Sequence, residues 1–413
     1  MSTTLLPDLI LDSRGVRSGI GVSFEGGIIT RLGPSGEGER LPGRALAPGF
    51  VNDHSHAFQR ALRGRSERTG DFWSWRETMY GLAQDLTLQE LKGISLACYR
   101  EMLRAGYTSV SEFHYLHHRP DGTLYEDPKA SAEVVAEAAG EAGIRLLLLP
   151  AAYARGGIPR FRDPKPEVFL KRVEELSIWA SQRPLLEVGI AAHSVRAVPR
   201  EWLEDLAAYA KEHGLPLHIH ACEQVREVEE CKTEHGLTPI ELLVKTGSLG
   251  PRTTVIHATH ASERELDLLS EYDSRVCACP TTEGNLGDGF LPARQIFERG
   301  IDLSIGSDSQ VRIAPFEELR ELETNARRIS QRRGVLVRED DPSTAAWLLQ
   351  VGWQKEALEP GSPADFIEID LDHPALAYIE PEDLTSALVF GADASVVSAT
   401  WVAGKQVYRR EER

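Results

Sequence analysis

Residues 215–223 read Leu-Pro-Leu-His-Ile-His-Ala-Cys-Glu, an apolar run that ends in polar side chains able to bind a metal. A helix-patterned stretch follows, and another apolar run begins at Thr253. Repeated alternation of an apolar strand and a helix indicates strands that lie parallel in one sheet. The runs are, in order, Leu46 to Asp53, Thr108 to Phe113, Ile144 to Leu149, Leu186 to Ala192, Leu215 to Ala221, Thr253 to Ala258, Arg275 to Cys279 and Ile301 to Ile305. Eight strands are what a closed (β/α)8 barrel requires, so we predict an α/β fold with a TIM-like barrel.

Helix start signals lie between these runs. Thr87-Leu88-Gln89-Glu90 has the spacing of a capping box, and the apolar-periodic stretch behind it ends at Gly106. Thr238-Pro239-Ile240-Glu241 combines the same box with Pro at the first helical position. Both segments are therefore predicted to begin helices that connect barrel strands.

Both ends of the chain read as short strands and turns. The last stretch, Ser395 to Tyr408, has the pattern of a strand, a Gly404-Lys405 turn and a second strand. We expect the two ends to pair into one small β-sandwich domain. The predicted division of the chain is residues 1–47 for the first part of the small domain, 48–358 for the barrel and 359–413 for the second part of the small domain.

Composition limits the classes of function. The chain has 413 residues, of which 41% are hydrophobic and 26% charged, as in an ordinary globular protein. A formal net charge of −17 disfavours binding to nucleic acid or to an anionic membrane. No apolar run approaches the roughly 20 residues of a membrane helix, and no signal peptide is recognisable, so we expect a cytoplasmic protein. The five cysteines indicate reduced thiols, and an anionic substrate would need a local cluster of Arg or Lys.

Metal-capable residues follow several of the predicted strands. The first strand ends in His54-Ser55-His56, whose imidazoles share a face because residues i and i+2 of a strand point the same way. The fifth strand offers His218 and His220, the sixth His257, and the eighth Asp308. Three imidazoles and a carboxylate at one barrel mouth suit zinc or iron with an open position for water. Spacing alone leaves open whether His218 or His220 is the third imidazole.

These motifs resemble the deaminase branch of the amidohydrolase superfamily. The resemblance is carried by Pro-Gly-Phe-x-x-x-His-x-His, His-x-His-x-x-Glu, a His after strand six and a Ser-Asp after strand eight. In that branch the second His of His-x-His-x-x-Glu binds the metal. The resemblance therefore implies a zinc site, with iron as an alternative, whose ligands are His54, His56, His220 and Asp308. It also implies a single ion, because Gly189 to His193 at the end of strand four contains neither the Lys nor the Glu of dinuclear relatives.

A narrower resemblance, to formimidoylglutamate deiminases, runs nearly end to end. It is carried by residues 54–60, 72–77, 112–118 and 279–289. It implies hydrolysis of N-formimino-L-glutamate with release of ammonia, a role in histidine degradation and a homodimer. The residues that match the substrate-binding positions of the family are Gln59, Arg76, Tyr115, His193 and Arg196.

The resemblance implies that one group of residues binds the substrate and that a second group carries out the hydrolysis. Arg76 and Arg196 can clamp the glutamate carboxylates, because guanidinium groups donate bidentate hydrogen bonds to carboxylates. A bound zinc ion lowers the pKa of water toward about 7 and so supplies a nucleophile at neutral pH. Asp308 and His257 would orient and deprotonate that water, and Glu223 would carry a proton to the departing ammonia.

Two other functions compete with this hypothesis. A related aminohydrolase could act on another amidine, a guanidino compound or a nucleobase, although a neutral base has no use for two guanidinium groups. A metal-binding barrel without catalysis is the second alternative. The presence of Glu223, His257 and Asp308 disfavours the second alternative, since a protein without catalysis has no need of acid/base residues.

Overall fold

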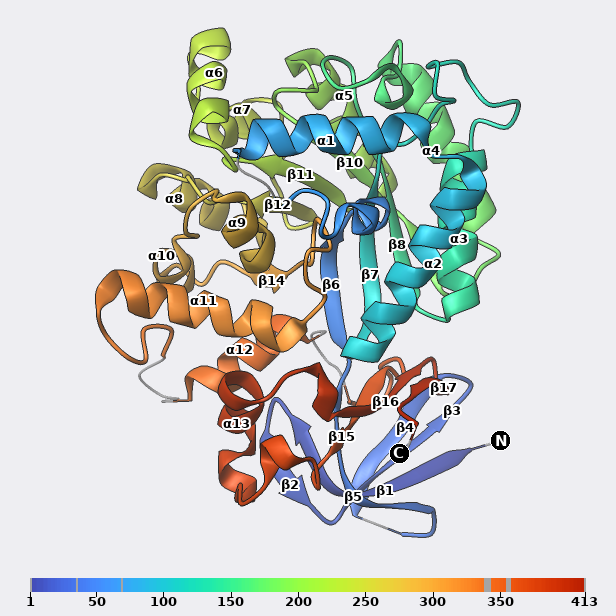
Figure 1. Ribbon diagram of the computed structural model, residues 1–413, viewed down its shortest axis with the longest axis vertical. Helices are drawn as coiled ribbons and strands as arrows, with labels where there is room; N and C mark the ends of the chain where they lie inside the picture. The colour runs from blue at the N-terminus through green and yellow to red at the C-terminus, as the bar shows by residue number, and fades with distance from the viewer. Residues whose placement is uncertain (1, 35, 68–69, 338–342, 354–357, 412–413) are drawn as a thin grey trace.

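Eight parallel strands of the barrel follow one another in space in the order of the sequence (Figure 1). A computed structural model describes residues 2–34, 36–67, 70–337, 343–353 and 358–411. The barrel strands are β6 (Phe50–Ser55), β7 (Tyr107–His114), β8 (Arg145–Ala152), β10 (Ile190–Ser194), β11 (Leu217–Ala221), β12 (Thr253–His257), β13 (Arg275–Ala278) and β14 (Leu303–Ile305), and the short β9 (Leu186–Val188) pairs with β8. The first and last strands meet where Ser55 bridges Asp308. This arrangement confirms the predicted TIM-like barrel.

Two predicted strands are divided at glycines. The run Leu46 to Asp53 is shared between β5 (Glu39–Pro48) and β6, and the run Leu186 to Ala192 is shared between β9 and β10. A Cβ at Gly49 would lie 2.2 Å from a side-chain carbon of Thr108, and a Cβ at Gly189 would lie 2.9 Å from the carbonyl oxygen of Pro216. Each glycine therefore allows a neighbouring strand to approach where a side chain would collide.

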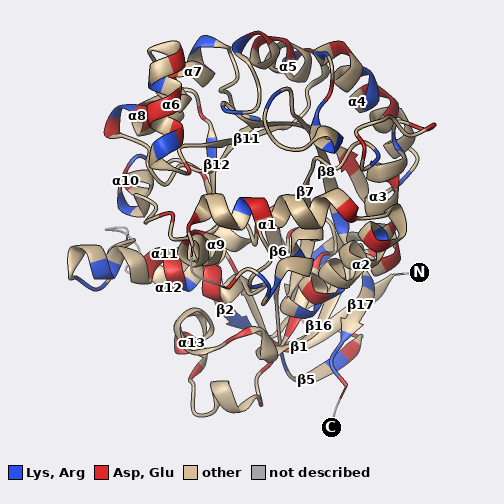
Figure 2. Ribbon diagram, turned by 45° about the horizontal axis from the view of Figure 1, so that its top comes forward, with Lys and Arg blue, Asp and Glu red and all other residues tan. Residues whose placement is uncertain are grey.

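Helices surround the barrel and also cover its mouth. Their bounds are α1 (Phe72–Asp85), α2 (Leu88–Ala105), α3 (Ala130–Ala142), α4 (Pro166–Ala180), α5 (Arg200–His213), α6 (Val225–His235), α7 (Pro239–Lys245), α8 (Glu263–Glu271), α9 (Pro280–Leu286), α10 (Ala293–Glu298), α11 (Pro315–Ser330) and α12 (Thr344–Gly352). Capping boxes at Thr87 and Thr238 begin α2 and α7, as predicted. Helix α1 lies across the mouth of the barrel, where the strands end (Figure 2).

The two ends of the chain form one mixed sheet, as Figure 1 shows below the barrel. Its strands are β1 (Thr3–Asp12), β2 (Gly15–Ser18), β3 (Ile20–Glu25), β4 (Ile28–Pro34), β5, β15 (Phe366–Asp370), β16 (Val397–Val402) and β17 (Lys405–Arg409). β5 and β15 pair antiparallel and so join the two ends of the chain. The expected small domain is thus present, with all eight strands hydrogen-bonded into one sheet. Residues 1 and 413, the outer limits of the predicted segments, lie outside the described residues.

The C-terminal segment also contains a helix where only strands and turns were expected. This helix, α13 (Leu384–Gly391), packs against α11 and α12, and it buries Leu384, Leu388 and Val389. Short 3-10 turns flank it: η3 (Pro374–Leu376), η4 (Pro381–Asp383) and η5 (Ala394–Val396). The spacing of Leu384 and Leu388 places both on one helical face, so burial against the barrel helices favours a helix here. In the described part of the chain, no helix combines the length and apolar character that crossing a membrane requires.

Candidate metal centre and substrate cavity

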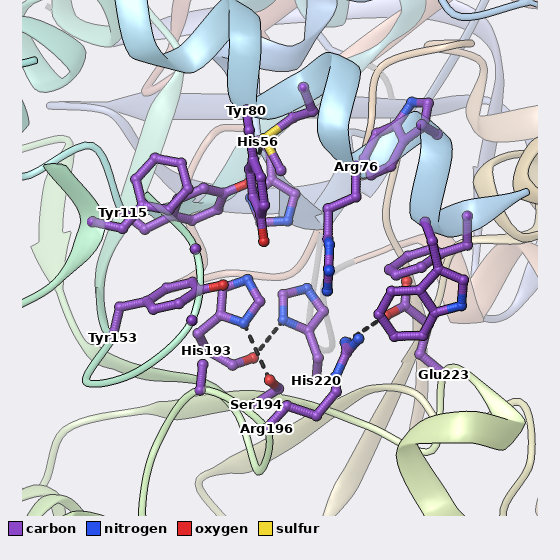
Figure 3. Close-up of a pocket in the computed structure, with 18 of the residues that line it drawn as sticks. His56, Arg76, Tyr80, Tyr115, Tyr153, His193, Ser194, Arg196, His220 and Glu223 are labelled. Carbon is purple, nitrogen blue, oxygen red and sulfur yellow. Dashed lines mark hydrogen bonds and ion pairs between the residues drawn. The ribbon is translucent and has the colours of Figure 1, made fainter. Parts of the chain in front are cut away.

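A cavity of about 520 Å³ opens at the carboxyl ends of the barrel strands. Figure 3 shows that side chains from α1 and from several strand ends point into it. This is the end of a (β/α)8 barrel at which enzymes place their chemistry. The residues expected to bind substrate all line this cavity: Gln59, Arg76, Tyr115, His193 and Arg196.

Three imidazoles and a carboxylate converge at the floor of the cavity. The Nε2 atom of His54 lies 3.1 Å from Nε2 of His220 and 3.3 Å from Oδ1 of Asp308. Oδ1 of Asp308 is also 3.4 Å from Nε2 of His56. Atoms bound tetrahedrally to zinc at about 2.1 Å are about 3.4 Å from one another, so these separations fit one zinc-sized ion.

In two of the rings, a hydrogen bond at Nδ1 leaves the Nε2 atom free to bind a metal. The Nδ1 atom of His56 lies 2.9 Å from the carbonyl oxygen of Phe113, and Nδ1 of His220 lies 2.7 Å from that of His193. A carbonyl accepts only from a protonated ring nitrogen, so both Nε2 atoms carry a lone pair when the rings are neutral. Burial, followed by the charges of neighbouring histidines, lowers the pKa of His54 and His220 well below its usual value. The site is therefore rich in neutral nitrogen donors.

The described residues contain two groups that could hold a metal ion. One is His54, His56 and His220, and the other is His257, Cys279 and Asp308, with the ligand atoms within 4.8 Å of one another in each group. The first group, joined by the neighbouring Asp308, supplies the nitrogen and oxygen set that zinc accepts. His218 is in neither group and does not line the cavity. The structure thus brings His220, rather than His218, to the other two imidazoles.

A second set of titratable groups lies beside this cluster. Nε2 of His257 is 3.5 Å from Oε1 of Glu223 and 3.8 Å from Oδ2 of Asp308, and its Nδ1 is 3.3 Å from Oε1 of Glu283. Burial alone would lower the pKa of His257, but the carboxylates of Glu223, Glu283 and Asp308 raise it well above its usual value. His257 therefore lies within 3.8 Å of each of the other two residues expected to move protons.

The backbone at the strand ends adopts conformations that most residues avoid. Cys222, His257, Ala258, Asp308 and Gln310 have φ between 45° and 73°. Positive φ is uncommon for residues other than glycine, and it persists where the surroundings fix it. Here the side-chain amide of Gln310 donates to the carbonyl oxygen of Asp308 at 2.7 Å, which holds that turn closed. Two of these residues, His257 and Asp308, line the cavity.

Four arginines line the cavity, and they differ in how close the nearest carboxylate lies. Arg155 pairs with Glu234 and Arg226 with Glu230, each at 2.7 Å. Arg196 lies 3.3 Å from Glu223, so the two expected functional residues contact each other. For Arg76, the nearest carboxylate among the described residues is Glu77, 4.0 Å away.

The guanidinium of Arg76 lies between two aromatic rings. Its central carbon is 4.5 Å from the centre of the Trp73 ring and 5.4 Å from the centre of the Tyr80 ring. Figure 3 shows this guanidinium pointing into the cavity. Stacked on rings and weakly paired with carboxylates, Arg76 is available to an anionic ligand.

Sequence reasoning missed several residues of the site. Tyr153 follows the end of β8, and the position of polar residues at strand ends could have revealed it. Tyr80 lies four residues after Arg76, on the same face of α1, so helical periodicity could also have found it. Glu283 contacts His257 from α9, and no local pattern connects two residues so far apart in the chain.

Most of the sequence matches a known family. The Amidohydrolase family model matches residues 45–407, and the chain belongs to this family. Together with the two possible metal-binding groups, this membership defines a metal-dependent amidohydrolase that acts on C–N bonds.

Individual relatives have related activities. The formimidoylglutamate deiminase of Pseudomonas aeruginosa is 35% identical over 408 residues, which cover 93% of this chain and 89% of the relative. A 5-methylthioadenosine/S-adenosylhomocysteine deaminase of Haloarcula marismortui is 27% identical, over 88% of this chain and 81% of the relative.

Solved structures share the fold. An amidohydrolase from Brucella melitensis superposes with a TM-score of 0.90 at 33% identity, covering 98% of this chain and 94% of the other. An adenosine deaminase from Xanthomonas campestris with bound zinc superposes with a TM-score of 0.85 at 22% identity, covering 98% of this chain and 92% of the other. The second likeness supports the fold alone.

Proposed function

We propose that the protein hydrolyses N-formimino-L-glutamate to N-formyl-L-glutamate and ammonia, using one zinc ion held by His54, His56, His220 and Asp308. The observation that carries this proposal is one cavity with a cluster of metal-capable imidazoles at its floor and the weakly paired guanidinium of Arg76 in its wall. The 35% identity to a formimidoylglutamate deiminase over 93% of the chain supports the same substrate.

The two ends of the substrate need different partners. Arg76 binds a carboxylate of the glutamate part, and Arg196, on the same wall, binds the other. Tyr115, Gln59 and His193 complete the donors, with the Gln59 amide already donating to the Tyr115 hydroxyl at 2.8 Å. These groups place the formimino carbon next to the imidazole cluster.

The bond changes use His257 and the two acid/base carboxylates near it, those of Glu223 and Asp308. When bound, zinc supplies a Lewis acid that lowers the pKa of water toward about 7. Asp308 and His257 orient the attacking water and accept its proton, while its oxygen forms a bond to the formimino carbon. Glu223 delivers one proton to the formimino nitrogen as its C=N double bond becomes single. The second water proton reaches the same nitrogen as the C=O double bond of the formyl group forms, so the remaining C–N bond breaks with release of ammonia.

Three further features belong to the same proposal. They are a role in histidine degradation, a cytoplasmic location and a homodimeric assembly, all expected from the sequence. None of them is needed for the chemistry at the cavity.

The test is release of ammonia from N-formimino-L-glutamate by purified, zinc-loaded protein. N-formimino-L-aspartate, cytosine, guanine and 5′-methylthioadenosine run in parallel, and protein stripped with a chelator is the control. We expect fast turnover of the glutamate compound, loss of activity after stripping and recovery when zinc is returned. No turnover of that compound by protein with verified zinc would overturn the assignment, and turnover of a nucleobase or nucleoside instead would identify the related aminohydrolase.

A further inference from the structure

A buried arginine lies behind the substrate cavity and takes no part in the proposed chemistry. Arg160, in the short turn η2 (Pro159–Phe161), has 0% of its surface exposed. Within the described residues, no carboxylate lies within 4.0 Å of its guanidinium, whereas buried Arg172 pairs with Asp163. A buried guanidinium without a carboxylate is costly, so its surroundings must compensate for the charge in another way.

The end of α1 supplies part of that compensation, through Nη1 alone, whereas Nε and Nη2 of Arg160 have no hydrogen-bond partner among the described residues. Nη1 of Arg160 donates to the carbonyl oxygens of Ala83, Gln84 and Leu86, the last at 3.0 Å. Because the final carbonyls of a helix have no partner within it and carry a partial negative charge, a cation there is favourable. α1 has no basic residue in its own last turn. Arg160 therefore caps α1 from a different segment of the chain.

The same turn is fixed to the rest of the cavity wall. The carbonyl oxygen of Arg160 accepts from the backbone N–H groups of His117 and His118, at 3.1 and 3.0 Å. The ring of Phe161 packs 5.9 Å from the ring of Tyr80 on α1 and 4.9 Å from that of Tyr115. η2 thus connects α1 to the loop that follows β7.

We propose that Arg160 is a positioning residue that fixes α1 over the cavity and, through α1, holds the guanidinium of Arg76 in place for the substrate carboxylate. Arg76 lies seven residues before Ala83, about 10 Å along the helix axis. A small rotation of the anchored end would therefore move Arg76 relative to the imidazole cluster. Because Arg76 is proposed to bind the substrate and not to react with it, such a displacement should weaken substrate binding more than it slows the chemical step. This inference rests on the proposed function for the identity of the substrate.

Steady-state kinetics of zinc-loaded variants provide the first test. Arg160→Met removes the donors, and Arg162→Met, at an exposed position in the same loop, is the matched control. We expect Arg160→Met to raise KM for N-formimino-L-glutamate about tenfold while kcat changes less than about threefold, the pattern of lost substrate binding. Arg160→Lys should give an intermediate KM, because its ammonium keeps the charge without the planar array of donors. An unchanged KM in Arg160→Met would overturn the proposal.

A double-mutant cycle tests whether Arg160 acts through Arg76. In the Arg76→Met background, Arg160→Met should change kcat/KM less than about twofold, because the group being positioned is already gone. An equal loss in both backgrounds would show that Arg160 acts by another route. Failure of both Arg160→Met and Arg160→Lys to fold would also overturn the proposal, because it would assign Arg160 to global stability.

Hydrogen exchange separates this inference from the proposed function, since it needs no turnover. Amides of α1 should exchange faster in Arg160→Met than in the unchanged protein or in Arg162→Met, while amides of β10, β11 and β12 keep their rates. Binding of L-glutamate, as an unreactive dicarboxylate, should weaken in the same variant. If the protein does not turn over N-formimino-L-glutamate but α1 loosens as expected, only the substrate assignment fails. If α1 exchange is unchanged, the positioning role fails even in an active enzyme.

Discussion

Glu223 makes three contacts that bear on proton transfer. Its Oε1 lies 3.5 Å from Nε2 of His257, and its Oε2 lies 3.3 Å from Nη2 of Arg196. Its backbone N–H donates to Oε2 of buried Glu227 at 3.1 Å. His257 and Arg196 therefore hold the carboxylate and Glu227 holds the backbone, as expected for a residue proposed to meet a substrate nitrogen at a fixed point.

Replacing Glu223 with Gln should abolish most turnover without unfolding the protein. The amide has nearly the same shape but cannot exchange a proton, and general acid/base help is typically worth about 10²–10⁴-fold. We expect kcat to fall by that factor while zinc content and the melting temperature stay near those of the unchanged protein. Glu229→Gln, at an exposed position on α6, the helix that follows Glu223, is the control and should leave kcat unaltered. Near-normal activity of Glu223→Gln with zinc bound would remove Glu223 from the mechanism.

The sequence predicts the individual groups of the site better than their pairings. Two imidazoles at i and i+2 share a face in any strand, so His54 and His56 could be placed together from spacing alone. The same rule applies to His218 and His220, and their depth in the barrel, which spacing does not encode, decides which one reaches the cavity. The pairing of Arg196 with Glu223 joins the ends of β10 and β11, so it depends on how neighbouring strands align.

Two glycines of helix α2 should have opposite effects on stability when each is replaced with alanine. Gly106 ends the helix with φ of +99°, whereas Gly93 lies in its exposed interior with no atom within 4 Å of an added Cβ. Gly106→Ala should destabilise the protein by at least about 1 kcal/mol, because alanine does not tolerate that backbone conformation. Gly93→Ala should stabilise it by about 0.5–1 kcal/mol, since alanine loses less entropy in a helix. Urea unfolding measures both, and the same sign for the two variants would contradict this reading of the helix.

Element boundaries were predictable only where local chemistry marks them. The capping boxes at Thr87 and Thr238 begin helices at the expected positions, because their side chains satisfy backbone groups of the same turn. Helix α13 carries no such box, and its apolar residues fit a strand as well as a helix until α11 and α12 are in place. The divisions at Gly49 and Gly189 likewise depend on the approach of distant segments.

Across the whole molecule, the two ends of the chain meet in one sheet that adjoins the barrel. Arg145 on β8 donates to the carboxylate of Asp365 at 2.9 and 3.2 Å, and so ties the barrel to the segment that begins β15. The alternation of strands and helices predicts the barrel, because each βαβ unit is local in sequence. The single mixed sheet is harder to predict, because β5 and β15 lie more than 300 residues apart and nothing local to either strand specifies the pairing.

Buried neutral histidines also make the stability of the whole molecule depend on pH. His117 lies 2.8 Å, through Nε2, from the carbonyl oxygen of Ala151. Burial, with the charge of Arg172 and the neighbouring His114, lowers its pKa well below the usual value. In the unfolded chain the pKa returns to about 6.5, so below that pH the unfolded state binds the proton and the folded state does not. Stability contributed by neutral His117 is therefore present above about pH 6.5 and is lost as the pH falls below it.

His117→Gln should reduce this dependence on pH. Glutamine can still donate to the carbonyl of Ala151 but does not titrate, so the free energy of unfolding should fall less between pH 7.5 and 5.0 than in the unchanged protein. Urea unfolding at both pH values measures the difference, with chelator present because metal binding is itself linked to protons. His213→Gln, at an exposed position on α5, is the control and should keep the full fall in stability. An equal fall in His117→Gln and the unchanged protein would show that His117 does not contribute to acid unfolding.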